Sequence, residues 1–213
     1  MRITVFGAAG TAGSRIVGEA LARGHEVTAV GRTAAGPDGL PAEVMTRSGD
    51  ATDPDQVAAA AAGTDVVVSA TRPRPGHEYE LAVVAQSLLD GLRGTGVRLL
   101  VVGGAGDLIV PGTDGGRVME QPDFPPDWLP IALACRAQRE VFTSAATDVD
   151  WSYLSPPALL EPGQRRGTYR LGADELLSDH AGISRISMED LAVALLDEAE
   201  EPRHRRRRFT VAY

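Results

Sequence analysis

Short apolar runs alternate with helical patterns along most of the chain. Runs rich in valine, isoleucine and leucine, bounded by glycine or polar residues, predict buried strands. These runs lie at residues 2–6, 26–30, 43–46, 65–71, 97–102, 150–154 and 209–213. Apolar residues three or four positions apart predict amphipathic helices after Gly13 and at residues 56–62, 80–93, 131–146 and 187–198. This alternation predicts an α/β fold in which helices cover both faces of a doubly wound, mainly parallel sheet.

Two long segments interrupt the alternation. Residues 107–130 are rich in proline, glycine and aspartate, and residues 158–182 are irregular and polar. A loop of the length of residues 107–130 in a compact domain is either functional or mobile. A shorter loop rich in glycine and proline is expected at residues 34–41. Because no repeat or linker divides the chain, we predict one domain over residues 1–213, with the two long segments as walls of a substrate pocket.

The first predicted strand ends in a glycine-rich turn that leads directly into a helix. Gly7 permits a tight turn, Gly10 permits the backbone to approach a pyrophosphate, and Gly13 permits helix and strand to pack closely. The first N–H groups of the helix and the positive end of its dipole would then face the anion. The spacing is G-x-x-G-x-x-G, which differs from the common dinucleotide fingerprint G-x-G-x-x-G, so an ordinary strand–helix loop is the alternative.

The end of the second predicted strand bears on which nicotinamide dinucleotide would bind. An acidic residue there would bind the ribose 2′-hydroxyl and repel a 2′-phosphate. The chain instead has Arg32, whose planar guanidinium suits phosphate. This residue favours NADP(H) over NAD(H), and the alternative is an arginine in a solvated loop.

Two predicted helices begin with typical capping residues. Asp53 precedes Pro54, which predicts an N-cap followed by proline at the first helical position. Ser187 predicts a second N-cap, and Asp190 three residues later predicts a capping box with it.

Composition and charge exclude several function classes. The net charge of −8 opposes general affinity for nucleic acid, and we interpret the basic run at residues 203–208 as a solvated loop before the last strand. No apolar run approaches the roughly 20 residues that span a bilayer, so no membrane partner is expected. The first strand and turn occupy the place of a secretory leader, which makes a cytoplasmic location the expectation.

The cysteine and histidine content argues against disulfides, cysteine clusters and metal sites. A single cysteine, Cys135, excludes an internal disulfide and is expected as a buried structural thiol in a helix. The four histidines are scattered, so no metal site is predicted. The oligomeric state is not predicted.

With these motifs placed, the chain resembles the NAD(P)H-binding, NADH-flavin reductase group of atypical short-chain dehydrogenases. It is more distantly similar to NmrA-like proteins and to biliverdin reductase B. The resemblance covers nearly the whole chain and includes the glycine turn and the pairs Gly31-Arg32 and Gly49-Asp50. Four later motifs carry it further: VVGGAG at 101–106, DWSYLSP at 150–156, RIS at 185–187 and RFTV at 208–211.

This resemblance implies a Rossmann domain that binds NADP(H) along the carboxyl ends of its strands. The implied contacts are Gly7, Ala9, Gly10, Thr11, Ala12 and Gly13 around the pyrophosphate, Arg32 at the 2′-phosphate, Asp50 and Ala51 at the adenine, Ala70 and Thr71 at the ribose, Arg72 near the phosphates, and Gly103, Gly104, Ala105 and Pro156 at the nicotinamide.

The chain lacks the acid–base pair of ordinary short-chain dehydrogenases. Those enzymes use Tyr-x-x-x-Lys, in which the lysine lowers the tyrosine pKa and the tyrosine transfers a proton. All 21 basic residues of this chain are arginine, and no tyrosine is followed by a basic residue four positions later. No catalytic residue is therefore predicted.

Hydride transfer to a planar acceptor requires less of a protein. Stacking two rings within reach supplies most of the catalysis, and protons come from solvent. The predicted function is an NADPH-dependent oxidoreductase that acts on a small planar acceptor, such as the flavins FMN and FAD or a quinone. The main alternative is a non-catalytic, NADP-binding sensor or regulator of the NmrA-like kind, and an isomerase or a sugar-nucleotide enzyme is the third.

Overall fold

The computed structural model describes residues 1–32 and 39–213, so most of the loop predicted at residues 34–41 lies outside the described residues. The helices are α1 (Thr11–Ala22), α2 (Pro54–Ala61), α3 (Glu80–Leu92), α4 (Leu129–Ser144) and α5 (Met188–Glu200). The strands are β1 (Arg2–Phe6), β2 (Glu26–Gly31), β3 (Met45–Ser48), β4 (Val66–Ser69), β5 (Arg98–Val102), β6 (Trp151–Ser155), β7 (Leu159–Glu161), β8 (Arg170–Gly172), β9 (Arg185–Ser187) and β10 (Arg207–Ala212). Two 3₁₀ turns, η1 (Val118–Glu120) and η2 (Pro126–Trp128), precede α4. None of the helices in the described ranges has the length and apolar character needed to cross a membrane.

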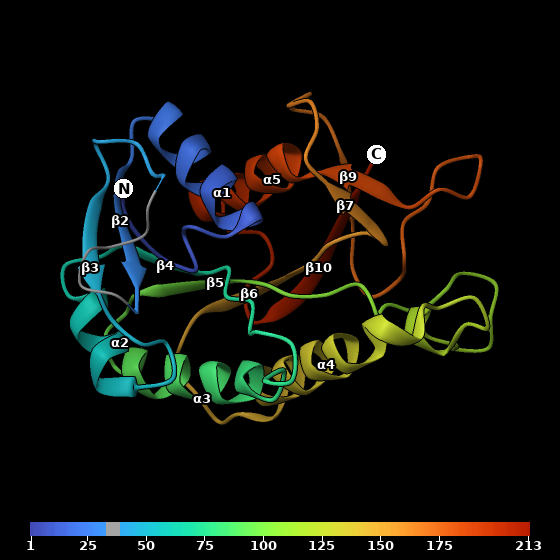
Figure 1. Cartoon of the computed structure of the whole chain (residues 1–213), viewed down its shortest axis with the longest axis horizontal. Helices are drawn as coiled ribbons and strands as arrows, with labels where there is room; N and C mark the ends of the chain where they lie inside the picture. Colours follow the sequence, from blue (N-terminus) through green and yellow to red (C-terminus); the bar gives the residue numbers. More distant parts are fainter. Residues whose placement is uncertain (33–38) are drawn as a thin grey trace.

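One large sheet organises the molecule. Its strand order is β3-β2-β1-β4-β5-β6-β10-β8, and every neighbouring pair runs parallel except β10 and β8. Helices α1 and α5 pack together on one face, and α2, α3 and α4 cover the other (Figure 1). The predicted doubly wound α/β fold of the Rossmann type is confirmed. The carboxyl ends of its parallel strands therefore meet along one edge of the sheet, where such folds bind ligands.

Whether a strand can be predicted from its apolar residues depends on its place in the sheet. All four residues of β4 are buried because helices cover both faces there, and the strand is a continuous apolar run. All four residues of β3 are exposed at the sheet edge. The strand predicted at residues 43–46 begins two residues too early, because β3 starts at Met45, which pairs with Thr28. The exposed residues of β3 form no apolar run that could mark its position.

The segment at residues 158–182 is more ordered than predicted. Strand β7 pairs with β9 in a small parallel sheet, and β8 pairs antiparallel with β10. The expectation of an irregular segment is therefore wrong at residues 159–161 and 170–172. Strands β7, β8 and β9 have three residues each, and a strand this short shows no periodic pattern in the sequence.

Both predicted N-caps are confirmed, and the predicted capping box is wrong. The Asp53 carboxylate accepts hydrogen bonds from the Asp55 and Gln56 N–H groups, and Ser187 Oγ accepts one from the Asp190 N–H at 3.0 Å. The Asp190 carboxylate does not accept a hydrogen bond from the Ser187 N–H, which instead donates to the Tyr213 hydroxyl. It is fully buried and accepts from the N–H groups of residues 166 and 167 and from the Tyr213 hydroxyl, so it anchors a distant loop.

Glu19 connects α1 to the distant segment that contains Arg165, and it makes stability depend on pH. Its carboxylate accepts from Arg165 Nε at 2.7 Å and from Arg23 Nε at 2.8 Å. The Arg165 hydrogen bond, opposed by burial and assisted by Arg23, lowers the pKa of Glu19 from 4.5 to about 2. A lowered carboxyl pKa contributes stability above the unfolded value, and this is lost as the pH falls towards the folded value.

We therefore expect Glu19→Gln to lower the melting temperature at neutral pH and to flatten its decline between pH 4.5 and about 2. Thermal unfolding followed by circular dichroism across this range measures both effects. Parallel declines in the wild-type protein and the variant would contradict the assignment to Glu19.

Candidate functional site

Two glycines of the turn after β1 are required by close packing. Gly7 has φ +80°, and a Cβ there would lie 2.5 Å from the Ala70 carbonyl oxygen. A Cβ at Gly13 would overlap the Gly7 carbonyl oxygen and lie 2.9 Å from its carbonyl carbon. The predictions that Gly7 permits a tight turn and that Gly13 permits close approach of helix and strand are confirmed.

The first turn of α1 presents unpaired backbone donors. Gly10 is the N-cap residue, and no side chain caps the helix. Within the described residues, the N–H groups of Thr11, Ala12 and Gly13 donate no hydrogen bond. Free N–H groups at the positive end of a helix dipole are suited to an anion. The turn therefore has the donors and the electrostatic character that a phosphate group requires.

A cavity opens in front of this turn, at the carboxyl ends of β1, β2, β3 and β4. It brings together eight of the predicted cofactor contacts: Gly7, Ala9, Gly10, Arg32, Asp50, Ala51, Thr71 and Arg72. Leu81 and Val84 of α3 supply an apolar wall that no sequence motif indicates. The apolar periodicity of α3 was visible in the sequence, but which of its residues face the strand ends depends on how the helix packs.

Asp50 lines the cavity and has one carboxylate oxygen without a hydrogen-bond partner in the described residues. Its Oδ1 accepts from the Thr52 N–H at 2.9 Å and from Thr52 Oγ1 at 2.8 Å, and its N–H donates to Gln56 Oε1. Its Oδ2 accepts no hydrogen bond from the described residues. Asp50 is thus held in place by one oxygen while the other can accept a hydrogen bond from a ligand.

The remaining predicted contacts do not line this cavity. They are Thr11, Ala12 and Gly13 in the first turn of α1, Ala70 after β4, Gly103, Gly104 and Ala105 after β5, and Pro156 after β6. All of them lie at or near the same edge of the sheet as the cavity, because β1, β4, β5 and β6 are parallel neighbours.

Packing within the protein accounts for the glycines after β5. A Cβ at Gly103 would overlap the ring of Tyr153, and one at Gly104 would lie 2.9 Å from Cys135 Sγ. A Cβ at Gly106 would lie 2.6 Å from the Cβ of Ala132. These residues are small because α4 and β6 approach the loop closely, and their contact with a nicotinamide stays a prediction.

Two titratable groups that pack against this loop, Tyr153 and Cys135, are poor acids and bases at neutral pH. The buried Tyr153 hydroxyl contacts the Cys135 carbonyl oxygen at 3.0 Å and Gln138 Oε1 at 3.1 Å, and burial raises the pKa of Tyr153 well above its usual value. Burial likewise raises the pKa of the Cys135 thiol to about 11, while the positive charge of Arg72 opposes this. In the part of the chain that the structure describes, no group of His, Cys, Asp or Glu side chains could hold a metal ion.

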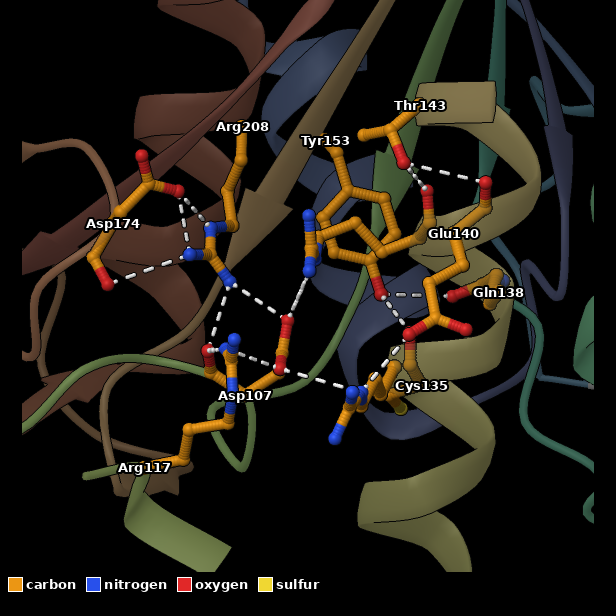
Figure 2. Close-up of polar contacts among 11 residues, drawn as sticks. Asp107, Arg117, Cys135, Gln138, Glu140, Thr143, Tyr153, Asp174 and Arg208 are labelled. Atoms are coloured by element: carbon orange, nitrogen blue, oxygen red, sulfur yellow. Dashed lines mark hydrogen bonds and ion pairs between the residues drawn. The ribbon is translucent and has the colours of Figure 1, made fainter. Parts of the chain in front are cut away.

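Beyond Cys135, a buried carboxylate is the centre of an arginine cluster (Figure 2). The Asp107 carboxylate lies 2.6 Å from Arg117 Nη1, 2.6 Å from Arg139 Nη2 and 3.3 Å from Arg208 Nη1. Arg208 also pairs with Asp174. The interpretation of residues 203–208 as a solvated loop is wrong at Arg208, because this residue belongs to β10 and its side chain, 5% exposed, points into the cluster.

The two predicted pocket walls lie side by side. The Ile109 N–H donates to the Asp174 carbonyl oxygen at 2.9 Å, and the Leu176 N–H donates to the Ile109 carbonyl oxygen at 2.8 Å. The ion pairs of Arg208 with Asp107 and Asp174 join the same two segments. Residues 107–130 and 158–182 are therefore tied to each other near the carboxyl end of β5.

Comparisons with known proteins agree with this geometry. The NAD(P)H-binding family model matches residues 7–199. The uncharacterized protein YwnB of Bacillus subtilis (strain 168) is 36% identical over 213 residues, which cover 99% of this chain and 98% of YwnB. A crystal structure of a putative exported protein from Burkholderia pseudomallei is 42% identical with a TM-score of 0.89, and each chain is 100% covered. SP1627 from Streptococcus pneumoniae TIGR4, named a putative NADH-flavin reductase, is 32% identical with a TM-score of 0.89 over 100% of this chain and 99% of SP1627.

Proposed function

The chain belongs to the NAD(P)H-binding family, and we propose that it is an NADPH-dependent oxidoreductase that transfers hydride to a flavin, a quinone or a similar planar acceptor. The observation that carries this proposal is the cavity lined by Arg32 and Arg72 in front of the free N–H groups of α1. The name given to SP1627 supports the class of acceptor.

In this proposal the backbone binds the pyrophosphate and side chains select the nucleotide. The N–H groups of Thr11, Ala12 and Gly13 donate to the pyrophosphate, as helix N-termini do for anions. Arg32 forms charge-assisted hydrogen bonds with the 2′-phosphate, and the free Oδ2 of Asp50 accepts from the adenine. Further contacts come from Ala51, Ala70, Thr71, Arg72, Gly103, Gly104, Ala105 and Pro156.

The proposed reaction depends more on placing the nicotinamide and the acceptor ring close together than on acid–base catalysis. When bound, NADPH supplies a hydride. The Tyr153 hydroxyl is buried against the Cys135 carbonyl and has a raised pKa, so it is not available as a general base at neutral pH. An acceptor ring that receives the hydride directly and takes its proton from solvent suits such a site, because proximity supplies most of the rate.

Nucleotide titration followed by addition of FMN tests the proposal. We expect the protein to bind NADPH more tightly than NADH, measured by nucleotide fluorescence, and to oxidise bound NADPH when FMN or a quinone is added. If NADPH binds and persists with flavins and quinones alike, the oxidoreductase proposal is contradicted. That result would favour a sensor or regulator of the NmrA-like kind, which binds the nucleotide without consuming it.

A substitution of Arg32 tests the choice of nucleotide. Arg32→Ala is expected to raise the Kd for NADPH by about 10- to 150-fold, because a hydrogen bond to a charged group contributes about 1.5–3 kcal/mol. The Kd for NADH should stay nearly constant, since NADH has no 2′-phosphate.

Arg93→Ala is the matched control, because Arg93 pairs with Asp90 on the surface at the end of α3 and does not line the cavity. It should change neither Kd. Equal weakening of NADPH and NADH by Arg32→Ala would mean that Arg32 does not contact the 2′-phosphate.

A further inference from the structure

The cluster around Asp107 holds more guanidinium groups than its carboxylate can pair with. Asp107 is 4% exposed and contacts Arg117, Arg139 and Arg208, while Arg136 Nε lies 3.9 Å away. Arg208 has a second partner in Asp174, and Arg136 has one in Glu140. Arg117 and Arg139 have no other carboxylate within ion-pair distance in the part of the chain described. These two arginines therefore share one buried negative charge with each other and with Arg208.

Three of these arginines have donors to spare. Arg117 uses only Nη1, which donates to Asp107, and its Nε and Nη2 donate no hydrogen bond to the described residues. Arg136 uses only Nε, and Arg139 uses Nε and Nη2. Their side chains are 28%, 39% and 19% exposed for residues 117, 136 and 139. An anion arriving from solvent can therefore reach guanidinium groups that are already oriented by Asp107 and Glu140.

The cluster adjoins the place proposed for hydride transfer. Asp107 comes two residues after Ala105 in the chain, separated from it by Gly106. Gly104 packs against Cys135, and Arg136 is the next residue of α4. Arg72 of the nucleotide cavity is close enough to influence the Cys135 thiol. The arginine cluster therefore lies beyond the nicotinamide end of the proposed site, on the side away from Arg32.

We propose that Arg117, Arg136 and Arg139 form a subsite for a phosphate group of the hydride acceptor. This inference rests on the proposed function and specifies its substrate, a phosphorylated planar acceptor such as FMN. Guanidinium groups bind phosphate through planar, charge-assisted hydrogen bonds. Three of them lie within 3.9 Å of the Asp107 carboxylate and keep unused donors, which suits the several oxygens of a phosphomonoester. Asp107 is then a positioning residue that keeps these arginines aligned without using all their donors.

FMN and riboflavin form a matched pair for testing this subsite, because they share the isoalloxazine ring and differ by the phosphate. We expect the KM for riboflavin to exceed that for FMN by about tenfold or more, the effect of one hydrogen bond to a charged group. Arg136→Gln and, separately, Arg117→Gln should bring the ratio of the two KM values towards one. Arg93→Gln is the control and should keep the wild-type ratio. Melting temperatures confirm that each variant is folded.

A binding measurement separates this inference from the proposed function. Flavin fluorescence quenching in the presence of saturating NADP⁺, which occupies the Arg32 site, reports the Kd of each flavin without turnover. If FMN binds at least about tenfold more tightly than riboflavin and the arginine variants abolish the difference, the subsite stands even where neither flavin oxidises NADPH. Equal Kd and KM values for the two flavins in the wild-type protein would overturn the subsite and leave the oxidoreductase proposal intact. A preference for FMN that persists in both arginine variants would also overturn it.

Discussion

Asp107→Asn is expected to destabilise the protein by about 3–5 kcal/mol, the usual cost of removing one partner from a buried ion pair. The substitution leaves Arg208, whose side chain is 5% exposed, with only the exposed Asp174 as a charged partner. It also leaves Arg117 and Arg139 facing each other without the carboxylate between them. Asparagine has nearly the same shape as aspartate, so the loss reports charge and hydrogen bonding rather than a cavity. Denaturant unfolding measures the change in the free energy of unfolding.

Asp90→Asn is the matched control for this prediction. Asp90 forms a surface ion pair with Arg93 at 3.3 Å, and both side chains are largely exposed. Exposed pairs contribute about 0–1 kcal/mol, so the control should lie close to the wild-type protein. If the two variants were equally stable, the Asp107 cluster would not be a major source of stability.

Gly13→Ala and Gly18→Ala are expected to have opposite effects, although both residues lie in α1. A Cβ at Gly13 would overlap the backbone of Gly7, and backbone cannot move aside as a flexible side chain can. We expect a cost of about 1–3 kcal/mol, typical of overpacking, together with weaker NADPH binding because the turn is displaced. Gly18 is exposed and has no atom within 4 Å of the position of a Cβ. Alanine there should stabilise the helix by about 1 kcal/mol.

Thermal unfolding and NADPH titration of the two variants measure these effects. The Gly18 variant also controls for the general preference of helices for alanine. A stabilised Gly13→Ala protein with unchanged NADPH affinity would show that the turn tolerates a side chain, and the proposed pyrophosphate site would lose its geometric basis.

Local features of the fold were predictable because adjacent residues determine them. The strand, glycine turn and helix at the N-terminus, and the Asp53 and Ser187 caps, are each specified within a few residues. The alternation of strands and helices was also sufficient for the doubly wound sheet. Half of the candidate nucleotide contacts line one cavity because the turns that carry them all follow parallel strands and therefore meet at one edge.

Other features depend on pairs of residues far apart in the chain. From the sequence, Arg208 is one of several arginines in a predicted surface loop, but in the fold it pairs with buried Asp107. Asp190 is predicted as part of a helix cap, but its carboxylate accepts hydrogen bonds from the backbone N–H groups of residues 166 and 167. The sequence alone does not show that Tyr153 and Cys135 pack against Gly103 and Gly104. The sequence by itself thus determined the fold class, the turn and the helix starts, because these depend on local propensity and periodicity. Only the tertiary structure decided which charges are buried together and which small residues are needed for packing, because those properties arise from contacts between segments that no local pattern connects.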